Sequence, residues 1–287
     1  MSAPHQLISP LIDHLHSDGR LRVWSVVITI FGDAVQPHGG TVAMADLQTI
    51  LGHMGVENGA LRTAMSRLAK EGWVTRDRQG RNSFYRLSPA GLKSFIPATE
   101  KIYRAQYAPT PQKLVFAVGP DVIGTAREQL NALLAGFGGM ALRNGVALFA
   151  DPSEHLLHQL RQADLMLIDA DLNELPRWVA EKLELTEIEA DYQALLSRFT
   201  PLGEQAEQLA SLSPIDALCA RILLIHEWRR LILKQPPLPA HLLPEHWPGA
   251  AAHHLVSGLY RQLIEPSENW WSNGNGAEAR KVLAKRF

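Results

Sequence analysis

The sequence predicts an α+β protein of several domains: a winged helix-turn-helix, a small ferredoxin-like middle domain and an α-helical C-terminal domain. Three observations carry this prediction. A short amphipathic helix precedes a basic hairpin between residues 58 and 87, strands and helices alternate over 113–170, and the later apolar patterns have helical spacing. We therefore expect a DNA-binding domain at 1–97, a connecting arm with the ferredoxin-like domain at 98–174, and the helical domain at 175–287.

Composition narrows the class of protein. The chain has 287 residues, 46% of them hydrophobic, and a formal net charge of only -1, which argues against a general binder of polyanions. Cys219 is the only cysteine, so we expect no intrachain disulfide and a reducing, cytoplasmic setting. Residues 1–22 lack a signal-peptide pattern, and the apolar stretch 23–31 is too short to cross a bilayer. We expect no membrane partner.

The first domain is predicted to contain three helices followed by a hairpin. Residues 23–35 and 45–54 have helical apolar spacing, and Gly55 is placed to end the second of these helices. In the third helix, one apolar stripe is formed by Leu61, Ala64, Met65 and Leu68. Two short strands then meet around Gly80, which predicts a wing next to the third helix.

Local charge makes this helix and hairpin a candidate DNA-binding surface. From Glu57 to Arg86 there are seven Arg or Lys and three acidic residues, in a nearly neutral chain. The alternative is that these cations only solvate a surface helix, which is the usual role of helical charges. We favour DNA binding because the cations occur on both the helix and the hairpin tip. The candidates for base contacts are Arg62, Thr63, Ser66 and Arg67, and those for phosphate contacts are Lys70, Arg76, Arg78, Arg81, Asn82 and Ser83.

The order of the strand and helix patterns along the chain predicts the middle and last domains. Residues 113–170 contain a strand, a helix, two strands around Asn144–Gly145, a helix and a strand, which is the ferredoxin-like order. Helices are then expected at 175–183, 187–199, 201–212, 214–234 and 250–264. The Pro-rich segment 235–249 contains interleaved Leu and Trp residues, so we expect it to pack against another part of the chain.

Helix 214–234 carries a second group of cations. His226, Arg229 and Arg230 share one face, and Arg221 lies nearer the start of the helix. Two interpretations are equally supported: ion pairs with acids such as Asp216, Glu227 or Glu245, or an anion site for the phosphates of a bulky ligand.

The sequence offers no motif for catalysis. His241, His246, His253 and His254 lack the spacing of a zinc site, and there is no nucleophile elbow, Gly-rich phosphate loop or paired-carboxylate spacing. We therefore expect no metal, no cofactor and no enzyme activity.

Motifs along the chain resemble those of the phenylacetic acid catabolism repressor family, PaaX. They lie in all three predicted domains, so the resemblance covers the whole architecture. They are Phe31-Gly32-Asp33, Arg62-Thr63-Ala64, Arg67-Leu68, Lys70-Glu71-Gly72-Trp73, Gly80-Arg81, Ser83-Phe84-Tyr85, Lys101-Ile102-Tyr103-Arg104, Leu223-Leu224-Ile225-His226, Arg229-Arg230, Leu238-Pro239, Leu242-Leu243-Pro244 and Trp247.

The resemblance implies a homodimeric repressor that binds imperfectly palindromic operators of aromatic-acid catabolic operons. It also implies release by an aryl-acyl-CoA effector, typically phenylacetyl-CoA. Cations for the phosphates and an apolar pocket for the aryl group would then be needed. We assign effector binding to Arg221, His226, Arg229, Arg230 and Trp247, with Tyr103 and Arg104 at the joint expected to move.

Two alternatives remain open. One is a regulator of the same fold that senses another acyl-CoA or a free aromatic acid. The other is a metal-dependent nuclease, because the middle domain resembles CRISPR-associated ferredoxin-like nucleases. Such an enzyme needs an acidic ligand at the end of its first strand, whereas Asp121 falls one step late, in a turn.

Overall fold

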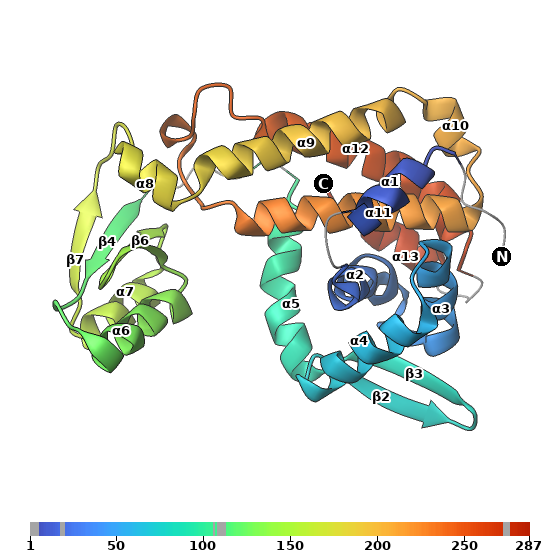
Figure 1. Cartoon of the computed structure of the whole chain (residues 1–287), viewed down its shortest axis with the longest axis horizontal. Coiled ribbons are helices and arrows are strands. Elements are labelled where there is room, and N and C mark those ends of the chain that lie inside the picture. Colours follow the sequence, from blue (N-terminus) through green and yellow to red (C-terminus); the bar gives the residue numbers. More distant parts are fainter. Residues whose placement is uncertain (1–5, 18–20, 106, 108–112, 272–275) are drawn as a thin grey trace. The chain divides into compact units, whose positions relative to one another are not determined.

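The computed structural model describes residues 6–17, 21–105, 107, 113–271 and 276–287, and the chain forms two compact units (Figure 1). The first unit contains Met1–Gln106, Tyr192–Leu233 and Ala250–Phe287, and the second contains Tyr107–Asp191 and Lys234–Gly249. Helices and two small antiparallel sheets are present, so the prediction of a mixed α+β chain is confirmed.

The N-terminal part of the first unit has the predicted helices and hairpin. Its elements are α1 (Ser9–Ser17), α2 (Val23–Ile30), the π-helical turn η1 (Phe31–Val35), the 3-10 turn η2 (Gln36–His38), β1 (Thr41–Ala43), α3 (Met44–His53), α4 (Asn58–Lys70), β2 (Val74–Gln79), β3 (Asn82–Leu87) and α5 (Pro89–Ile102). The three strands form an antiparallel sheet in the order β1-β3-β2. Helix α1 was not predicted.

C-terminal helices complete the same unit. They are most of α9 (Leu185–Gly203), α10 (Ala206–Ala210), α11 (Pro214–Lys234), α12 (Gly249–Glu268) and α13 (Gly276–Leu283). Helix α11 is buried along most of its length and runs past α2 (Figure 1). Contacts join it to the N-terminal helices: His53 Nε2 lies 2.8 Å from Asp216 Oδ1, and Cys219 Sγ lies 3.8 Å from the Ile50 carbonyl oxygen. The structure therefore groups 1–97 with much of 175–287, where the sequence predicted separate domains.

A buried charged network lies at the centre of the first unit. Asp33, in the π-helical turn, is fully buried and accepts hydrogen bonds at Oδ1 from the hydroxyls of Tyr103 and Tyr260, each at 2.9 Å. Arg221 Nε donates to Asp33 Oδ2 at 2.8 Å, and Arg286 Nη1 donates to Oδ1 at 3.1 Å. We call Asp33, Tyr103, Arg221, Tyr260 and Arg286 the Asp33 network.

Glu268 extends the Asp33 network. Arg221 Nη1 donates to Glu268 Oε1 at 2.8 Å, and His38 Nε2 lies 2.8 Å from the other carboxylate oxygen. Burial alone would lower the pKa of Arg221, but Asp33, Tyr260 and Glu268 raise it above its ordinary value. Arg221 is therefore a permanent cation, neutralised inside the protein.

The end of the sequence packs onto this network. The buried ring of Phe287 lies 5.5 Å from the Tyr103 ring and 5.2 Å from the Tyr260 ring, centroid to centroid. The backbone N–H of Phe287 donates to the carbonyl oxygen of Tyr103 at 3.2 Å. Neither α13 nor this contact was predicted, because the run of polar residues and glycines before α13 gave no helical pattern.

The second unit has the predicted order of elements. It contains β4 (Leu114–Val118), α6 (Gly124–Gly136), β5 (Met140–Arg143), β6 (Val146–Ala150), α7 (Glu154–Gln162), β7 (Met166–Ala170), α8 (Arg177–Lys182) and the 3-10 turn η3 (Ala240–Leu242). The strands form one antiparallel sheet in the order β5-β6-β4-β7.

Alternate side chains of this sheet enter two cores. Ala117 and Phe149 pack with Leu134 of α6 and Leu160 of α7. On the other face, residues such as Leu114 pack with Val179 of α8 and with the Pro-rich segment, through the buried residues Leu238 and Leu242. The prediction that this segment packs against another part of the chain is confirmed.

The predicted arm at 98–108 differs from the structure. Helix α5 continues through Pro97 to Ile102, so the first domain does not close at that proline. Pro97 removes one N–H donor without ending the helix. Residues 106 and 108 lie outside the described residues. Among the helices of the described residues, none has the length and apolar character needed to span a membrane.

We predict that Asp33→Asn lowers the free energy of unfolding by about 3–5 kcal/mol, because it leaves Arg221 and Arg286 buried without their shared carboxylate. Denaturant unfolding monitored by circular dichroism measures this loss. The control is Asp13→Asn, at an exposed position of α1, which should change stability by less than about 0.5 kcal/mol. A loss below about 1 kcal/mol for Asp33→Asn would contradict the central role of the network.

Candidate functional site

Helix α4 presents the predicted polar face to solvent. Its buried residues are those of the predicted apolar stripe, Leu61, Ala64, Met65 and Leu68. The five candidate DNA contacts on this helix are all exposed: Arg62, Thr63, Ser66, Arg67 and Lys70. The helix is thus fixed through one side, and its cations are available on the other.

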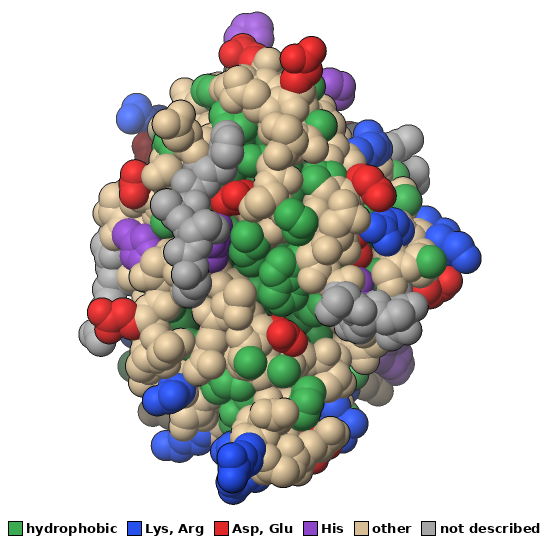
Figure 2. Space-filling view, turned by 90° about the vertical axis from the view of Figure 1, so that its right-hand side faces the viewer, with side chains coloured by type: hydrophobic (Ala, Val, Ile, Leu, Met, Phe, Trp, Pro, Cys, Tyr) green, Lys and Arg blue, Asp and Glu red, His purple; other side chains and the backbone are tan. Residues whose placement is uncertain are grey.

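The hairpin β2–β3 places further cations beside this helix. Gly80 adopts a left-handed conformation with φ of +61°, as a two-residue hairpin turn requires. Arg76, Arg78, Arg81 and Asn82 are all exposed, and Arg76 also donates to the Ser83 hydroxyl at 2.7 Å across the hairpin. Figure 2 shows Lys and Arg side chains at the lower end of the molecule, the end where Figure 1 places the hairpin.

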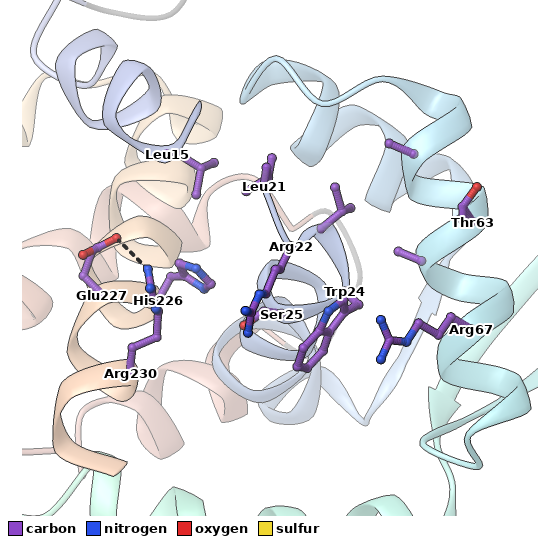
Figure 3. A pocket seen from close by; sticks show the side chains of 13 residues that line it. Leu15, Leu21, Arg22, Trp24, Ser25, Thr63, Arg67, His226, Glu227 and Arg230 are labelled. Carbon is purple, nitrogen blue, oxygen red and sulfur yellow. Dashed lines mark ion pairs between the residues drawn. The ribbon is translucent and has the colours of Figure 1, made fainter. Parts of the chain in front are cut away.

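A large cavity of about 1210 Å³ lies beside α4, within the first unit (Figure 3). One wall is α4, which contributes Thr63 and Arg67, and another is α11, which contributes His226 and Arg230. The start of α2 lies between them in Figure 3. The remaining lining residues are Leu15, Leu21, Arg22, Val23, Trp24, Ser25, Ala60, Ala64 and Glu227. Candidate DNA contacts and candidate effector contacts therefore line one cavity.

Arg67 is oriented by two neighbours. Its Nε donates to Glu71 Oε1 at 2.7 Å, and its Cζ lies 5.5 Å from the centroid of the Trp24 ring. Glu71 is exposed, so its attraction for Arg67 is screened by water. The guanidinium keeps exposed N–H donors for a phosphate or a base edge.

The α11 wall combines an anion and a cation with a neutral imidazole. Glu227 Oε2 accepts from Arg198 Nη1 at 3.2 Å, and its other carboxylate oxygen lies 4.0 Å from Arg230 Nη1. Burial, with Arg229 and Arg230 nearby, lowers the pKa of His226 to about 3. Since the Thr29 hydroxyl donates to the Ser25 carbonyl, it accepts from His226 Nδ1 at 3.0 Å.

Comparison with known proteins identifies the family. Residues 22–91 match the family model of a PaaX-like protein, and residues 183–273 match that of the PaaX-like protein C-terminal domain. The Transcriptional repressor PaaX of Escherichia coli (strain K12) is 34% identical over 255 residues, which cover 83% of this chain and 79% of that protein. The chain belongs to the PaaX family. The prediction that it is not an enzyme agrees with this membership.

A solved structure is also similar to this PaaX-family chain. It is the uncharacterized protein Rv0674 from Mycobacterium tuberculosis, with 20% sequence identity and a TM-score of 0.48. The similarity covers 91% of this chain and 97% of that one.

The structure places two of the predicted effector residues, Arg221 and Tyr103, in the Asp33 network. Both side chains are buried in the Asp33 network, where carboxylates and hydroxyls already occupy them. The ion-pair alternative therefore holds for Arg221, although its partners are Asp33 and Glu268, which the sequence did not indicate. His226 lines the large cavity, where its neutral imidazole adds no charge for a phosphate.

The other four predicted effector residues lie in four different places. Arg230 lines the large cavity, whereas Arg229 donates to Ser25 Oγ at 2.6 Å and lines a smaller one. Arg104 is exposed, and its backbone carbonyl oxygen lies 2.8 Å from His253 Nε2. Trp247 belongs to the second unit, where its Nε1 donates to the Tyr107 hydroxyl at 2.7 Å.

Sequence reasoning missed several residues of the large cavity, among them Arg22 and Trp24. Arg22 directly precedes α2, and Trp24 lies in its first turn, inside an apolar run that we interpreted only as a buried helix. A Trp next to an Arg at a helix start is a weak signal by itself. The match to the family begins at Arg22, so both residues fall within the part shared with PaaX-like proteins.

No observation on the described residues favours the nuclease alternative. Asp121 is exposed in the loop between β4 and α6. Among the side chains that the structure describes, no group of three His, Cys, Asp or Glu residues is arranged to hold a metal ion.

The neutral state of the His226 imidazole predicts how the stability of the fold depends on pH. Its pKa is about 3 in the folded chain and about 6.5 when unfolded, so only the unfolded chain gains this proton as the pH falls below 6.5. The neutral His226 therefore contributes to the free energy of unfolding above pH 6.5, and this contribution is lost as the pH falls toward 3. The loss is about 2 kcal/mol between pH 7 and pH 5. Between pH 8 and pH 5, the free energy of unfolding of the natural chain should therefore fall by about 2 kcal/mol more than that of the His226→Gln variant, as measured by urea unfolding. Parallel pH profiles would contradict a buried, neutral His226.

Proposed function

We propose that this chain is a transcriptional repressor that binds the operator DNA of an aromatic-acid catabolic operon. The proposal also includes release by an aryl-acyl-CoA such as phenylacetyl-CoA. The observation that supports it most is the exposed cationic face of α4 beside the basic β2–β3 hairpin, in a chain with almost no net charge. The name of the relative from E. coli, a transcriptional repressor, agrees with this function.

In this proposal α3, α4 and the hairpin act as a winged helix-turn-helix. Helix α4 would enter the major groove, where Arg62, Thr63, Ser66 and Arg67 read base edges. The wing would lie against the neighbouring backbone, where Arg78 and Arg81 neutralise phosphates. Lys70, Arg76, Asn82 and Ser83 complete the proposed phosphate contacts.

We propose a cytoplasmic homodimer, because one reading helix of 13 residues offers few base contacts for specific binding. Two chains related by a two-fold axis would place two α4 helices one helical turn of DNA apart. The operator would then consist of two half-sites in inverted orientation.

The proposed effector site is the large cavity. Arg22, Arg67 and Arg230 would bind the phosphates of CoA, and the apolar residues at the start of α2 would contact its uncharged parts. Since Thr63 and Arg67 would serve both DNA and CoA, the two ligands would exclude each other. Linkage then requires the effector to weaken operator binding by the same factor by which the operator weakens effector binding.

For DNA binding, we predict that Arg67→Ala lowers affinity for the operator about 5- to 100-fold, with little effect on random DNA, because base readout is lost. Arg81→Ala should weaken both and reduce the salt slope by about one unit. The operator can be found by selection from random duplexes, and mobility shifts measure the affinities. The control is Arg177→Ala, at an exposed position of α8, which should bind as the natural chain does. Equal losses on operator and random DNA for Arg67→Ala would contradict its proposed role.

For the effector, we predict that phenylacetyl-CoA releases the natural chain from its operator. Release of the Arg230→Ala variant should require at least a tenfold higher concentration of phenylacetyl-CoA, because one phosphate contact is lost. Release is measured by titration in the mobility shift. Free CoA, another acyl-CoA and phenylacetate are the comparison ligands, and each tests an alternative sensor. If none of the four released the DNA, the proposed regulation would be wrong.

A further inference from the structure

A second, smaller cavity of about 150 Å³ lies in the first unit between α2, α5 and α11. Its walls are mostly hydrocarbon and aromatic. They are formed by Ile28, Gly32, Trp73, Phe95, Ala98, Ile102, Ile225 and Leu233, together with Thr29, Ser94, Tyr103 and Arg229. The Phe95 ring lies against Gly32, where a Cβ atom would come within 2.2 Å of it, so the glycine leaves room for the ring in this wall.

Arg229 is the only cation that lines this cavity, counted over the described residues. Its Nη2 donates to the carbonyl oxygen of Ser25 at 3.2 Å and to the hydroxyl of Ser25 at 2.6 Å. Its Nε is buried and has no hydrogen-bond partner in the described structure. The nearest acidic residue along the helix, Glu227, is bonded to Arg198.

The charge of Arg229 is therefore poorly compensated. Burial, with Arg230 adding repulsion, lowers its pKa to about 10, although Tyr103 opposes the shift. No ion pair among the described residues includes Arg229, which differs from Arg221 with its two carboxylates. A partly buried cation without a counter-ion and a buried N–H donor without an acceptor both cost free energy, and a bound anion would remove both penalties.

We propose that the small cavity binds an aromatic monocarboxylate, with the ring among the hydrocarbon walls and the carboxylate accepting a hydrogen bond from Arg229 Nε. The size agrees, because an apolar cavity of roughly 150 Å³ accommodates a benzene ring. The aromatic side chains of Trp73, Phe95 and Tyr103 favour a flat ring over a branched chain. A CoA thioester carries no charge at its acyl end, so the partly buried guanidinium of Arg229 selects the free acid.

This site goes beyond the proposed repressor function and is separate from the large cavity. Its ligand would contact α2, α5 and α11 together, so binding would hold the N-terminal helices against the C-terminal ones. A ligand that binds only the folded chain also raises the temperature of unfolding in proportion to its occupancy.

The test is calorimetric titration of the full chain with benzoate and phenylacetate, with the neutral analogues benzamide and phenylacetamide as controls. We expect saturable binding of at least one acid with a stoichiometry of one per chain, and at least tenfold weaker binding of its amide. Equal binding of acid and amide would overturn the role of Arg229, and absence of binding by both acids would overturn the site.

Variants locate the binding. Arg229→Gln removes the charge and should weaken acid binding at least tenfold, whereas Arg230→Gln, the matched control on the next residue of α11, should change it less than twofold. Ala98→Leu fills the cavity from α5 without touching Arg229 and should abolish binding. Circular dichroism and the unfolding temperature verify that each variant is folded. Equal affinities for the natural chain and Ala98→Leu would overturn the assignment to this cavity.

Failure of the aromatic-acid site can be distinguished from failure of the proposed repressor function. Arg229→Gln and Ala98→Leu change neither α4 nor the hairpin, so both should bind the selected operator as the natural chain does when no ligand is present. Retained operator binding together with lost acid binding supports the separate site. Loss of operator binding in a folded Ala98→Leu variant would overturn the separation of the two sites.

Discussion

The first unit depends on the burial of one carboxylate, that of Asp33. A carboxylate without water is stable only when cations and donors surround it, and here two guanidinium groups and two hydroxyls do so. The ionised groups Asp33, Glu268, Arg221 and Arg286 balance in charge. Since they come from η1, α11, α12 and the end of the chain, folding must bring distant segments together before any of these charges can be buried.

The π-helical turn that holds Asp33 has a structural consequence for the neighbouring sites. Turns of this type are rare and occur mainly where a helix must present a particular group. Here the turn follows α2 directly, so the helix whose start lines the large cavity is fixed at its other end by the Asp33 network. Helix α11 contributes Arg221 to the same network and forms the opposite wall of that cavity. The Asp33 network therefore joins α2 and α11, two of the helices that line this cavity.

Sequence reasoning succeeded where the determining interactions were local. The stripe of Leu61, Ala64, Met65 and Leu68 is buried as predicted, because helical periodicity alone decides which residues face inward. It failed for the partners of Arg221, because Asp33 is 188 positions away and nothing in the local pattern distinguishes it from nearer acids. The same limit explains the grouping into units: apolar patterns predict that a helix packs, but not which helix it packs against.

In the proposed function, the residues that line the large cavity decide which ligands it would discriminate. Its cations, Arg22, Arg67 and Arg230, would contact phosphates, which every CoA ester carries in the same arrangement. Such contacts supply affinity and competition with DNA, but they do not distinguish one acyl group from another. Discrimination must come from apolar contacts, and a methylene more or less in an apolar pocket is worth only about 1–3 kcal/mol. In the proposed mechanism, recognition of an aromatic acyl group therefore requires surfaces other than the three arginines.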